Sequence, residues 1–110
     1  MMALVAFVDE KSILKYQKLK NGHTDEVHVH TLISLAIEKL RQNPFCGIQV
    51  KKERIPKEYL KKFEIQNLWK FNLSDNWRMT YSVISDEENI VVVILEWFDH
   101  KEYERRFGYG

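Results

Sequence analysis

The stretch that decides the fold is residues 67–97, NLWKFNLSDNWRMTYSVISDEENIVVVILEW. It holds three strand-like runs, 67–73, 77–84 and 89–97, rich in the aromatic and β-branched residues that favour strands. Short polar sequences, Ser-Asp-Asn and Ser-Asp-Glu-Glu, separate the runs and are typical of hairpin connections. Residues 90–95 are apolar at every position, which predicts a central strand covered on both faces. The stretch therefore predicts an antiparallel β-meander.

Alternation divides the first two strands of this meander into an apolar and a polar face. The face expected to pack on helices carries Trp69, Phe71, Leu73, Trp77, Met79, Tyr81 and Val83. The other face carries Lys70, Asn72, Arg78, Thr80 and Ser82. Its two cations are suited to binding a phosphate, and a guanidinium can contact two phosphate oxygens at once. The alternative is an ordinary solvated sheet face.

Two helices are expected before the meander. Residues 2–8 form a short apolar run that predicts a buried strand or the lead-in to a helix, and Asp9 can cap the helix that follows. The second helix is expected to begin after Thr24 or Asp25 and to end before Pro44. Apolar residues recur along it at steps of three and four: Val29, Leu32, Ile33, Ala36, Ile37 and Leu40. The two segments predict a helical hairpin with one apolar face.

After the second helix, residues 45–50 predict a short strand, and Pro56 is well placed in the first turn of a short helix. Residues 99–106, DHKEYERR, predict a short polar helix. The expected fold class is α+β, with an N-terminal helical hairpin packed on an antiparallel β-meander and a short C-terminal helix. The length fits one domain over residues 1–110, and no linker or repeat interrupts it.

Composition excludes several classes of protein. The chain has 17 Lys and Arg residues against 16 Asp and Glu residues, but residues 44–70 hold seven basic and three acidic residues. Such a local basic surface can attract a polyanion, although a solvated lysine face is the alternative.

The single Cys46 excludes an internal disulfide and is expected to be buried rather than catalytic. With no apolar run near the ~20 residues of a membrane span and no signal peptide, we expect a cytoplasmic protein.

Candidate proton-transfer groups lie in the last segment. His100 follows the apolar strand and can move a proton near neutral pH, and Tyr103, one helical turn later, is expected to share its face. A charged, solvent-facing tail is the alternative. His28 and His30 diverge by about 200° on a helix, and no glycine-rich phosphate loop occurs. We therefore expect neither a metal nor a cofactor.

The segments NLWKFNLSDNWRMTY at 67–81 and DHKEY at 99–103, separated by an apolar strand, resemble the RelE/ParE toxin superfamily. The chain is most similar to the archaeal RelE-like branch, which has a comparable His-Lys-Glu-Tyr segment before Phe-Gly-Tyr, and NPFCG at 43–47 also resembles that branch. The resemblance implies a toxin of a type II toxin–antitoxin pair. Such a toxin is a metal-independent endoribonuclease that cuts messenger RNA on the ribosome and so inhibits translation, with the RNA 2′-hydroxyl as nucleophile.

The resemblance also implies roles for individual residues. Arg78 matches a strand arginine that contacts the scissile phosphate, and Lys70 matches a lysine that supplies charge or helps to activate the hydroxyl. Tyr103 resembles a tyrosine associated with stacking or proton transfer, and His100 lies where relatives often carry a histidine or arginine. The expected RNA-binding residues are Lys51, Lys52, Arg54, Asn72 and Lys101.

Expected partners are a cognate antitoxin and the messenger RNA and ribosomal RNA of the ribosome. Tyr59, Phe63 and Trp97 are candidates for an antitoxin groove, although core packing is the favoured role. Two alternative functions stay open. One is a non-nuclease ParE-like toxin acting on a target such as gyrase, and the other is an inactive module of the same fold that only binds an antitoxin.

Overall fold

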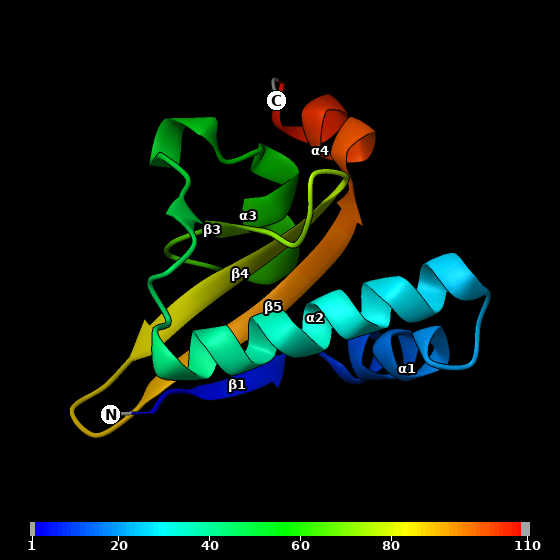
Figure 1. Cartoon of the computed structure of the whole chain (residues 1–110). Helices are drawn as coiled ribbons and strands as arrows, with labels where there is room; N and C mark the ends of the chain where they lie inside the picture. Colours follow the sequence, from blue (N-terminus) through cyan, green and yellow to red (C-terminus); the bar gives the residue numbers. More distant parts are fainter. Residues whose placement is uncertain (1, 109–110) are drawn as a thin grey trace.

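A computed structural model describes residues 2–108, and within these residues one five-stranded sheet carries helices on both faces (Figure 1). The strand order is β1-β5-β4-β3-β2. The elements in chain order are β1 (Leu4–Phe7), α1 (Glu10–Leu19), α2 (Thr24–Gln42), β2 (Ile48–Gln49), the 3₁₀ turn η1 (Lys52–Arg54), α3 (Lys57–Phe63), β3 (Trp69–Asn72), β4 (Trp77–Ser85), β5 (Ile90–Asp99) and α4 (His100–Phe107). The fold is therefore mixed α+β. Among residues 2–108, no helix is both long and apolar enough to cross a membrane.

The antiparallel meander is present as β3, β4 and β5. The sheet is not antiparallel throughout, however, because β1 pairs in parallel with β5 and places Leu4 opposite Val91. Parallel neighbours need a long connection, and here the whole chain between β1 and β5 forms it. The residues of β1 alone do not show which strand they will pair with.

Helix α1 begins as predicted, with the Asp9 carboxylate accepting a hydrogen bond from the Ser12 backbone N–H at 2.8 Å. Helix α2 begins earlier than predicted, because His23 rather than Thr24 or Asp25 occupies its N-cap position. The Glu26 carboxylate accepts the His23 backbone N–H at 3.1 Å, which satisfies a donor that would otherwise lack a partner at the helix start.

One face of the sheet packs on α2. The buried residues of α2 are Val29, Ile33, Ala36 and Leu40. They form a first core with the sheet residues Met79, Tyr81, Val83, Val92, Ile94 and Trp97. The face that alternation assigned to the interior is thus confirmed. Helix α1 joins this layer through Tyr16, whose ring stacks on His30 at 4.4 Å and whose hydroxyl hydrogen-bonds Ser34.

The opposite face of the sheet holds a second core beneath α3 and α4. Its buried residues are Ile55, Tyr59, Leu68, Leu95, Phe98, Tyr103 and Phe107. Ile94 and Leu95 belong to different cores, so β5 is covered on both faces, as its apolar run predicts. Tyr59 and Trp97 are buried and Phe63 is partly buried against the second core, so packing accounts for these three aromatic side chains.

The second core corrects the expectation of an open polar face, because Thr80 and Ser82 are buried. Thr80 hydrogen-bonds the Tyr59 hydroxyl at 2.9 Å, and Ser82 donates to the Asn67 side-chain oxygen at 3.1 Å. The segment after β2 folds over this part of the sheet as α3, so these hydroxyl groups find partners inside the protein.

Gly47 fixes β2 against the rest of the sheet. Its backbone N–H donates to the Tyr81 hydroxyl at 3.0 Å, and a Cβ at this position would lie 2.5 Å from that oxygen and 2.6 Å from the Lys70 carbonyl oxygen. Burial raises the pKa of Tyr81 to about 12, so its hydroxyl stays protonated. Only glycine permits this approach, which places β2 beside β3, with Ile48 opposite Lys70.

Cys46 is exposed, which corrects the prediction that it would be buried. A turn in which the Cys46 backbone N–H donates to the Asn43 carbonyl at 3.2 Å holds the residue at the surface, between α2 and β2. Desolvation of the sulfur raises the pKa of the thiol, which is the opposite of the change that activates a cysteine nucleophile.

Candidate functional site

The polar residues that α3 leaves uncovered lie where β3 and β4 approach α4. In the register of these strands, Lys70 is opposite Thr80 and Asn72 is opposite Arg78. Lys70, Asn72 and Arg78 therefore share one face, and opposite side chains on paired strands have Cβ atoms about 4.5–5.5 Å apart. The sequence prediction that the two cations share a face is confirmed.

Helix α4 follows β5 without a loop. The Asp99 carboxylate caps it by accepting the Glu102 backbone N–H at 2.8 Å, and the His100 backbone N–H donates to the Asn76 carbonyl at 2.7 Å. The second bond ties the start of α4 to the β3–β4 turn. The first residue of the helix is consequently held beside β4.

The guanidinium of Arg78 lies across the β3–β4 turn. Its Nη1 donates to the carbonyl oxygens of Ser74, Asp75 and Trp77 at 2.8, 3.1 and 3.2 Å, and its Nη2 lies 3.1 Å from Nδ1 of His100. Among residues 2–108, no carboxylate forms a salt bridge with Arg78. Its positive charge is held in place without being neutralised. Within residues 2–108, the Nε–H of Arg78 forms no hydrogen bond, and Nη2 has one protein partner for its two hydrogens.

Both nitrogens of the His100 ring have protein partners. Nε2 lies 2.5 Å from a carboxylate oxygen of Glu104, on the same helix, and Nδ1 faces Arg78. A guanidinium only donates, so Nδ1 is the acceptor of the Arg78 hydrogen bond, and the Glu104 contact is an ion pair when the ring is protonated. Glu104 was missed in the sequence analysis, although its spacing of four residues from His100 on a predicted helix was an available signal.

A second group of residues surrounds a small pocket of about 150 Å³. The residues that line it are Ile48, Gln49, Val50, Lys51, Arg54, Lys70 and Tyr103. The Lys70 ammonium lies 5.0 Å from the centre of the Tyr103 ring, and that ring stacks on Phe107 at 4.4 Å. Three basic side chains, two from η1 and its N-cap and one from β3, thus line one pocket with the Tyr103 ring.

The structure separates the predicted site residues into groups. Arg78 contacts His100, and Lys70 contacts Tyr103. Tyr103 is only 3% exposed, so its ring forms part of the pocket wall and does not project freely from α4. Asn72 is exposed opposite Arg78.

The remaining predicted RNA-binding residues differ in position. Lys51 and Arg54 reach the pocket beside Lys70. Lys52 and Lys101 are exposed and do not line this pocket.

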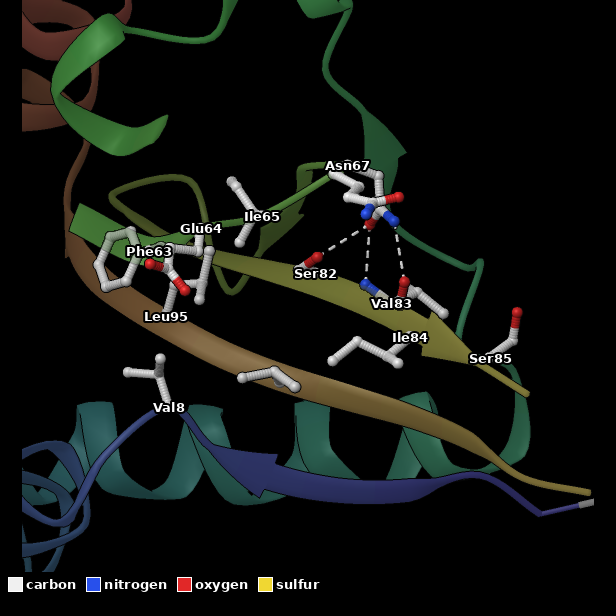
Figure 2. Close-up of a pocket in the computed structure, with 12 residues that line it drawn as sticks. Val8, Phe63, Glu64, Ile65, Asn67, Ser82, Val83, Ile84, Ser85 and Leu95 are labelled. Carbon is white, nitrogen blue, oxygen red and sulfur yellow. Dashed lines mark hydrogen bonds between the residues drawn. The ribbon is translucent and has the colours of Figure 1, made fainter. Parts of the chain in front are cut away.

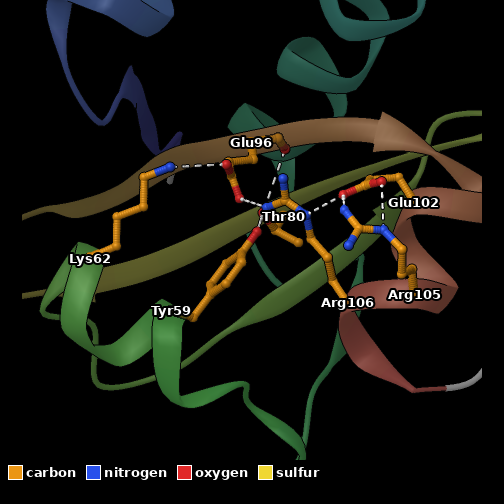
Figure 3. Close-up of polar contacts among 7 residues, drawn as sticks. All are labelled: Tyr59, Lys62, Thr80, Glu96, Glu102, Arg105 and Arg106. Atoms are coloured by element: carbon orange, nitrogen blue, oxygen red, sulfur yellow. Dashed lines mark hydrogen bonds and ion pairs between the residues drawn. The ribbon is translucent and has the colours of Figure 1, made fainter.

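An ion-pair network connects α3, β5 and α4 behind this site (Figure 3). Glu96 on β5 pairs with Lys62 at 3.2 Å and with Arg106 at 3.0 Å, and Arg106 also pairs with Glu102 at 2.8 Å. The Arg106 guanidinium lies 5.0 Å from the Phe98 ring centre. These contacts hold α4 against β5 and so fix the helix that carries His100 and Tyr103.

A larger pocket, about 630 Å³, lies elsewhere on the same sheet face, between the α3–β3 connection and strands β4 and β5 (Figure 2). Half of the twelve described residues that line it are aliphatic, and Glu64 is the one titratable side chain among them. Among the described residues, no Lys, Arg or His lines this pocket, so it lacks the cations that stabilise phosphate charge. Within residues 2–108, no cluster of three or more His, Cys, Asp or Glu side chains could hold a metal ion.

Neither known protein-family models nor curated proteins match the chain. Among solved structures, it is similar to a YoeB/ParE toxin from Agrobacterium tumefaciens, with 18% sequence identity and a TM-score of 0.56. The similarity covers 90% of this chain and 99% of that one. At this level of identity the comparison shows a shared fold.

Proposed function

We propose that the chain is the toxin of a type II toxin–antitoxin pair and that it inhibits translation by cutting messenger RNA on the ribosome. The shared fold with a YoeB/ParE toxin supports the toxin class, and the resemblance of residues 67–81 and 99–103 favours an archaeal RelE-like member. In this proposal α1 and α2 are the helical hairpin of a single RelE-like domain, and a cognate antitoxin silences the protein in the cytoplasm.

The observation that carries the nuclease proposal is that two cations on one face of the sheet each contact a group able to transfer a proton. Arg78 lies 3.1 Å from the His100 ring, and Lys70 lies 5.0 Å from the Tyr103 ring centre. Because Nη1 of Arg78 is already bound to the turn, the guanidinium is held still with donors left for a phosphate. A fixed, unneutralised cation of this kind stabilises charge that develops during a reaction.

The reaction is an attack of the RNA 2′-hydroxyl on the adjacent phosphorus. The O2′–P bond forms and the P–O5′ bond breaks, so the 2′-oxygen must lose a proton and the 5′-oxygen must gain one. We assign the first transfer to the His100 ring, whose Nδ1 becomes available once Nη2 of Arg78 donates to the phosphate in its place, and the second to the Tyr103 hydroxyl, while Arg78 and Lys70 stabilise the phosphate charge. The RNA supplies the nucleophile, so the step needs no metal.

RNA binding extends the site along η1. Lys51 and Arg54 share a pocket with Lys70, so they are placed to hold the neighbouring backbone phosphates. Asn72, beside Arg78, and the more distant Lys52 and Lys101 would contact flanking RNA or ribosomal RNA. These contacts position the backbone without reading its sequence.

The test compares Arg78→Ala and Lys70→Ala with the native protein after induction in cells. We expect transcript cleavage to fall by about 10²-fold or more in each variant, and growth arrest to be relieved. Lys18→Ala, which removes an exposed charge on α1, is the matched control and should leave both unchanged.

Loss of the Arg78 side chain also removes three hydrogen bonds to the β3–β4 turn, so thermal unfolding of each variant is measured beside cleavage. A folded Arg78→Ala protein that still cuts transcripts at the native rate contradicts the proposal. Arrest with intact transcripts selects a non-nuclease ParE-like toxin. Native protein that neither cuts transcripts nor slows growth selects an antitoxin-binding module.

A further inference from the structure

One edge of the sheet is β1, and within residues 2–108 no strand lies beyond it (Figure 1). We propose that two copies of this chain join through this edge, with one β1 antiparallel to the other about a two-fold axis at Ala6. The two sheets then form one continuous sheet. The inference is independent of the nuclease proposal, since β5 and β4 separate β1 from the strand that carries Lys70.

Two residues of β1 have backbone groups that no neighbouring strand uses. Phe7 is the register partner of Ile94, and the Val8 N–H donates to the Ile94 carbonyl oxygen at 2.9 Å. Successive residues of a strand direct their peptide groups to opposite sides, so the N–H and C=O of Val5 and Phe7 point away from β5. Within residues 2–108, these groups have no hydrogen-bond partner on that side.

The edge is closed at its first residue and unprotected after it. The Ala3 backbone N–H, on the same side as those of Val5 and Phe7, donates to the Arg41 carbonyl oxygen at 2.8 Å, so the last turn of α2 covers this end. The strand Leu4–Phe7 holds no charged residue and no proline, the residues that natural sheets use to keep an edge from pairing. An apolar edge with free peptide groups is suited to pairing with another strand.

Two-fold symmetry and the free backbone groups together define the register. Val5 of one copy lies opposite Phe7 of the other, and the two residues exchange both of their backbone hydrogen bonds. The symmetry repeats this pair, so every free group of Val5 and Phe7 gains a partner. Ala6 then faces its own counterpart as a non-hydrogen-bonded pair, with Cα atoms about 4.5 Å apart. The smallest side chain of β1 thus occupies the position of closest approach.

Hydrogen bonds that the chain already makes exclude the two neighbouring symmetric registers. A register centred on Val5 needs the Ala3 N–H, which donates to α2. A register centred on Phe7 needs the Asp9 carbonyl, which accepts a hydrogen bond from the first turn of α1. The register centred on Ala6 leaves both bonds intact.

This register also matches apolar side chains on both faces of the joined sheet. Val5 and Phe7 pack against the first core, so their contact across the axis extends that core. On the opposite face, Leu4 lies against Val8 of the second copy. Leu4 is 58% exposed in a single copy, so the contact removes apolar surface from water.

Charges beyond the paired strands are complementary as well. The register places Asp9 of one copy opposite Ala3 of the other, whose N–H is bound to the last turn of α2. That turn carries Lys39 and Arg41, and Arg41 also forms an exposed ion pair with Glu38. The acidic start of α1 therefore meets the basic end of α2, where side-chain charges and helix dipoles both attract. The chain supplies both halves of this pattern, which favours a second copy as the occupant of the edge.

The first arm of the test measures the mass of the full-length protein by sedimentation velocity over a range of concentrations. We expect a monomer–dimer equilibrium. Ala6→Lys places two like charges at the axis and should raise the dimer dissociation constant by about 100-fold or more. Ile84→Lys is the matched control, because it adds the same charge at an exposed residue on β4, two strands in from the edge. It should change the constant by less than about 3-fold.

A native protein that stays monomeric up to its limit of solubility overturns the inference, and so does a dimer that Ala6→Lys leaves intact. Ala6 is exposed, so the variant should fold, and thermal unfolding checks this. A chain that is monomeric alone and binds a different protein through β1 also overturns the inference. Each of these results leaves the proposed nuclease function standing.

The second arm reads the register and requires no disruptive charge. Cys46→Ser first removes the exposed native thiol. Ala6→Cys in that background places two thiols on Cα atoms about 4.5 Å apart, within the separation that a disulfide spans, so mild oxidation should cross-link the dimer. Leu4→Cys is the control, since its counterpart lies about 13 Å further along the facing strand, and it should stay uncross-linked. Cross-linking at Leu4 in place of Ala6, or at neither residue, overturns the inference.

Discussion

The side-chain amide of Asn67 extends the hydrogen bonding of the sheet beyond the residues that β3 covers. Its Nδ2 donates to the Val83 carbonyl at 2.8 Å, and its Oδ1 accepts the Val83 N–H at 2.8 Å (Figure 2). The same oxygen accepts from Ser82. One side chain therefore satisfies both peptide groups of Val83 where no neighbouring backbone reaches them.

We predict that Asn67→Ala lowers the free energy of unfolding by about 1–3 kcal/mol, because it leaves part-buried donors and acceptors without partners. Urea denaturation followed by tryptophan fluorescence measures the change. Asn89→Ala is the control, since the Asn89 side chain is exposed and makes no hydrogen bond within residues 2–108, and it should stay within about 0.5 kcal/mol of the native protein. Equal effects of the two substitutions would show that the hydrogen bonds between Asn67 and Val83 do not stabilise the protein in the way that strand pairing does.

At the scale of elements, charged side chains hold α4 in its position. Glu102 accepts hydrogen bonds from Arg105 and Arg106, and these bonds hold the pKa of the Glu102 carboxyl below its ordinary value of 4.5. Arg106 also reaches Glu96 on β5, so the ionised Glu102 belongs to the network that holds the helix in place. The carboxylate is solvent-accessible, so its stabilising effect is small.

This network predicts an acid-dependent contribution to stability. Because the folded pKa of Glu102 is the lower one, the unfolded chain binds more protons in the interval between the two values, and stability falls as pH falls through it. We expect the native protein to be slightly more stable than Glu102→Gln at neutral pH, and the difference to shrink below pH 4.5. Urea midpoints at several pH values measure it.

The control for this prediction repeats Glu102→Gln in a background where Arg105 and Arg106 are both glutamine. The partners that lower the pKa are then gone, so the pH-dependent difference should disappear. A difference of the same size in both backgrounds would assign the effect to another group.

At the scale of the whole molecule, β5 joins two cores that lie on opposite faces of one sheet. Ile94 faces α2 and Leu95 faces α3 and α4, and both are at most 2% exposed. In the first core, α2 packs as a layer on one face of the sheet. The second core positions the site, because Tyr103 and Phe107 are part of it.

We predict that Ile94→Val costs about 0.5–1.5 kcal/mol and Leu95→Ala about 2–5 kcal/mol of unfolding free energy. The two side chains share no core, so the double variant should equal the sum of the single changes within about 0.5 kcal/mol. Denaturant unfolding of the three variants measures this. A coupling energy above about 1 kcal/mol would mean that the two cores adjust to each other through the backbone of β5.

The sequence by itself determined the elements whose signal is local. Alternation in residues 69–83 separated the core face from the face of Lys70 and Arg78, and the three- and four-residue steps of α2 located its buried stripe. Asp9 identified the start of α1. These features follow from the periods of strand and helix, which any short stretch of sequence displays.

Only the tertiary structure decided which distant segments meet. It paired β1 in parallel with β5, placed α3 over Thr80, and brought Lys51 and Arg54 beside Lys70. It also turned His100 toward both Arg78 and Glu104. Periodicity reports which side of an element is buried but carries no information about the partner that buries it, because that choice depends on the packing of the whole chain.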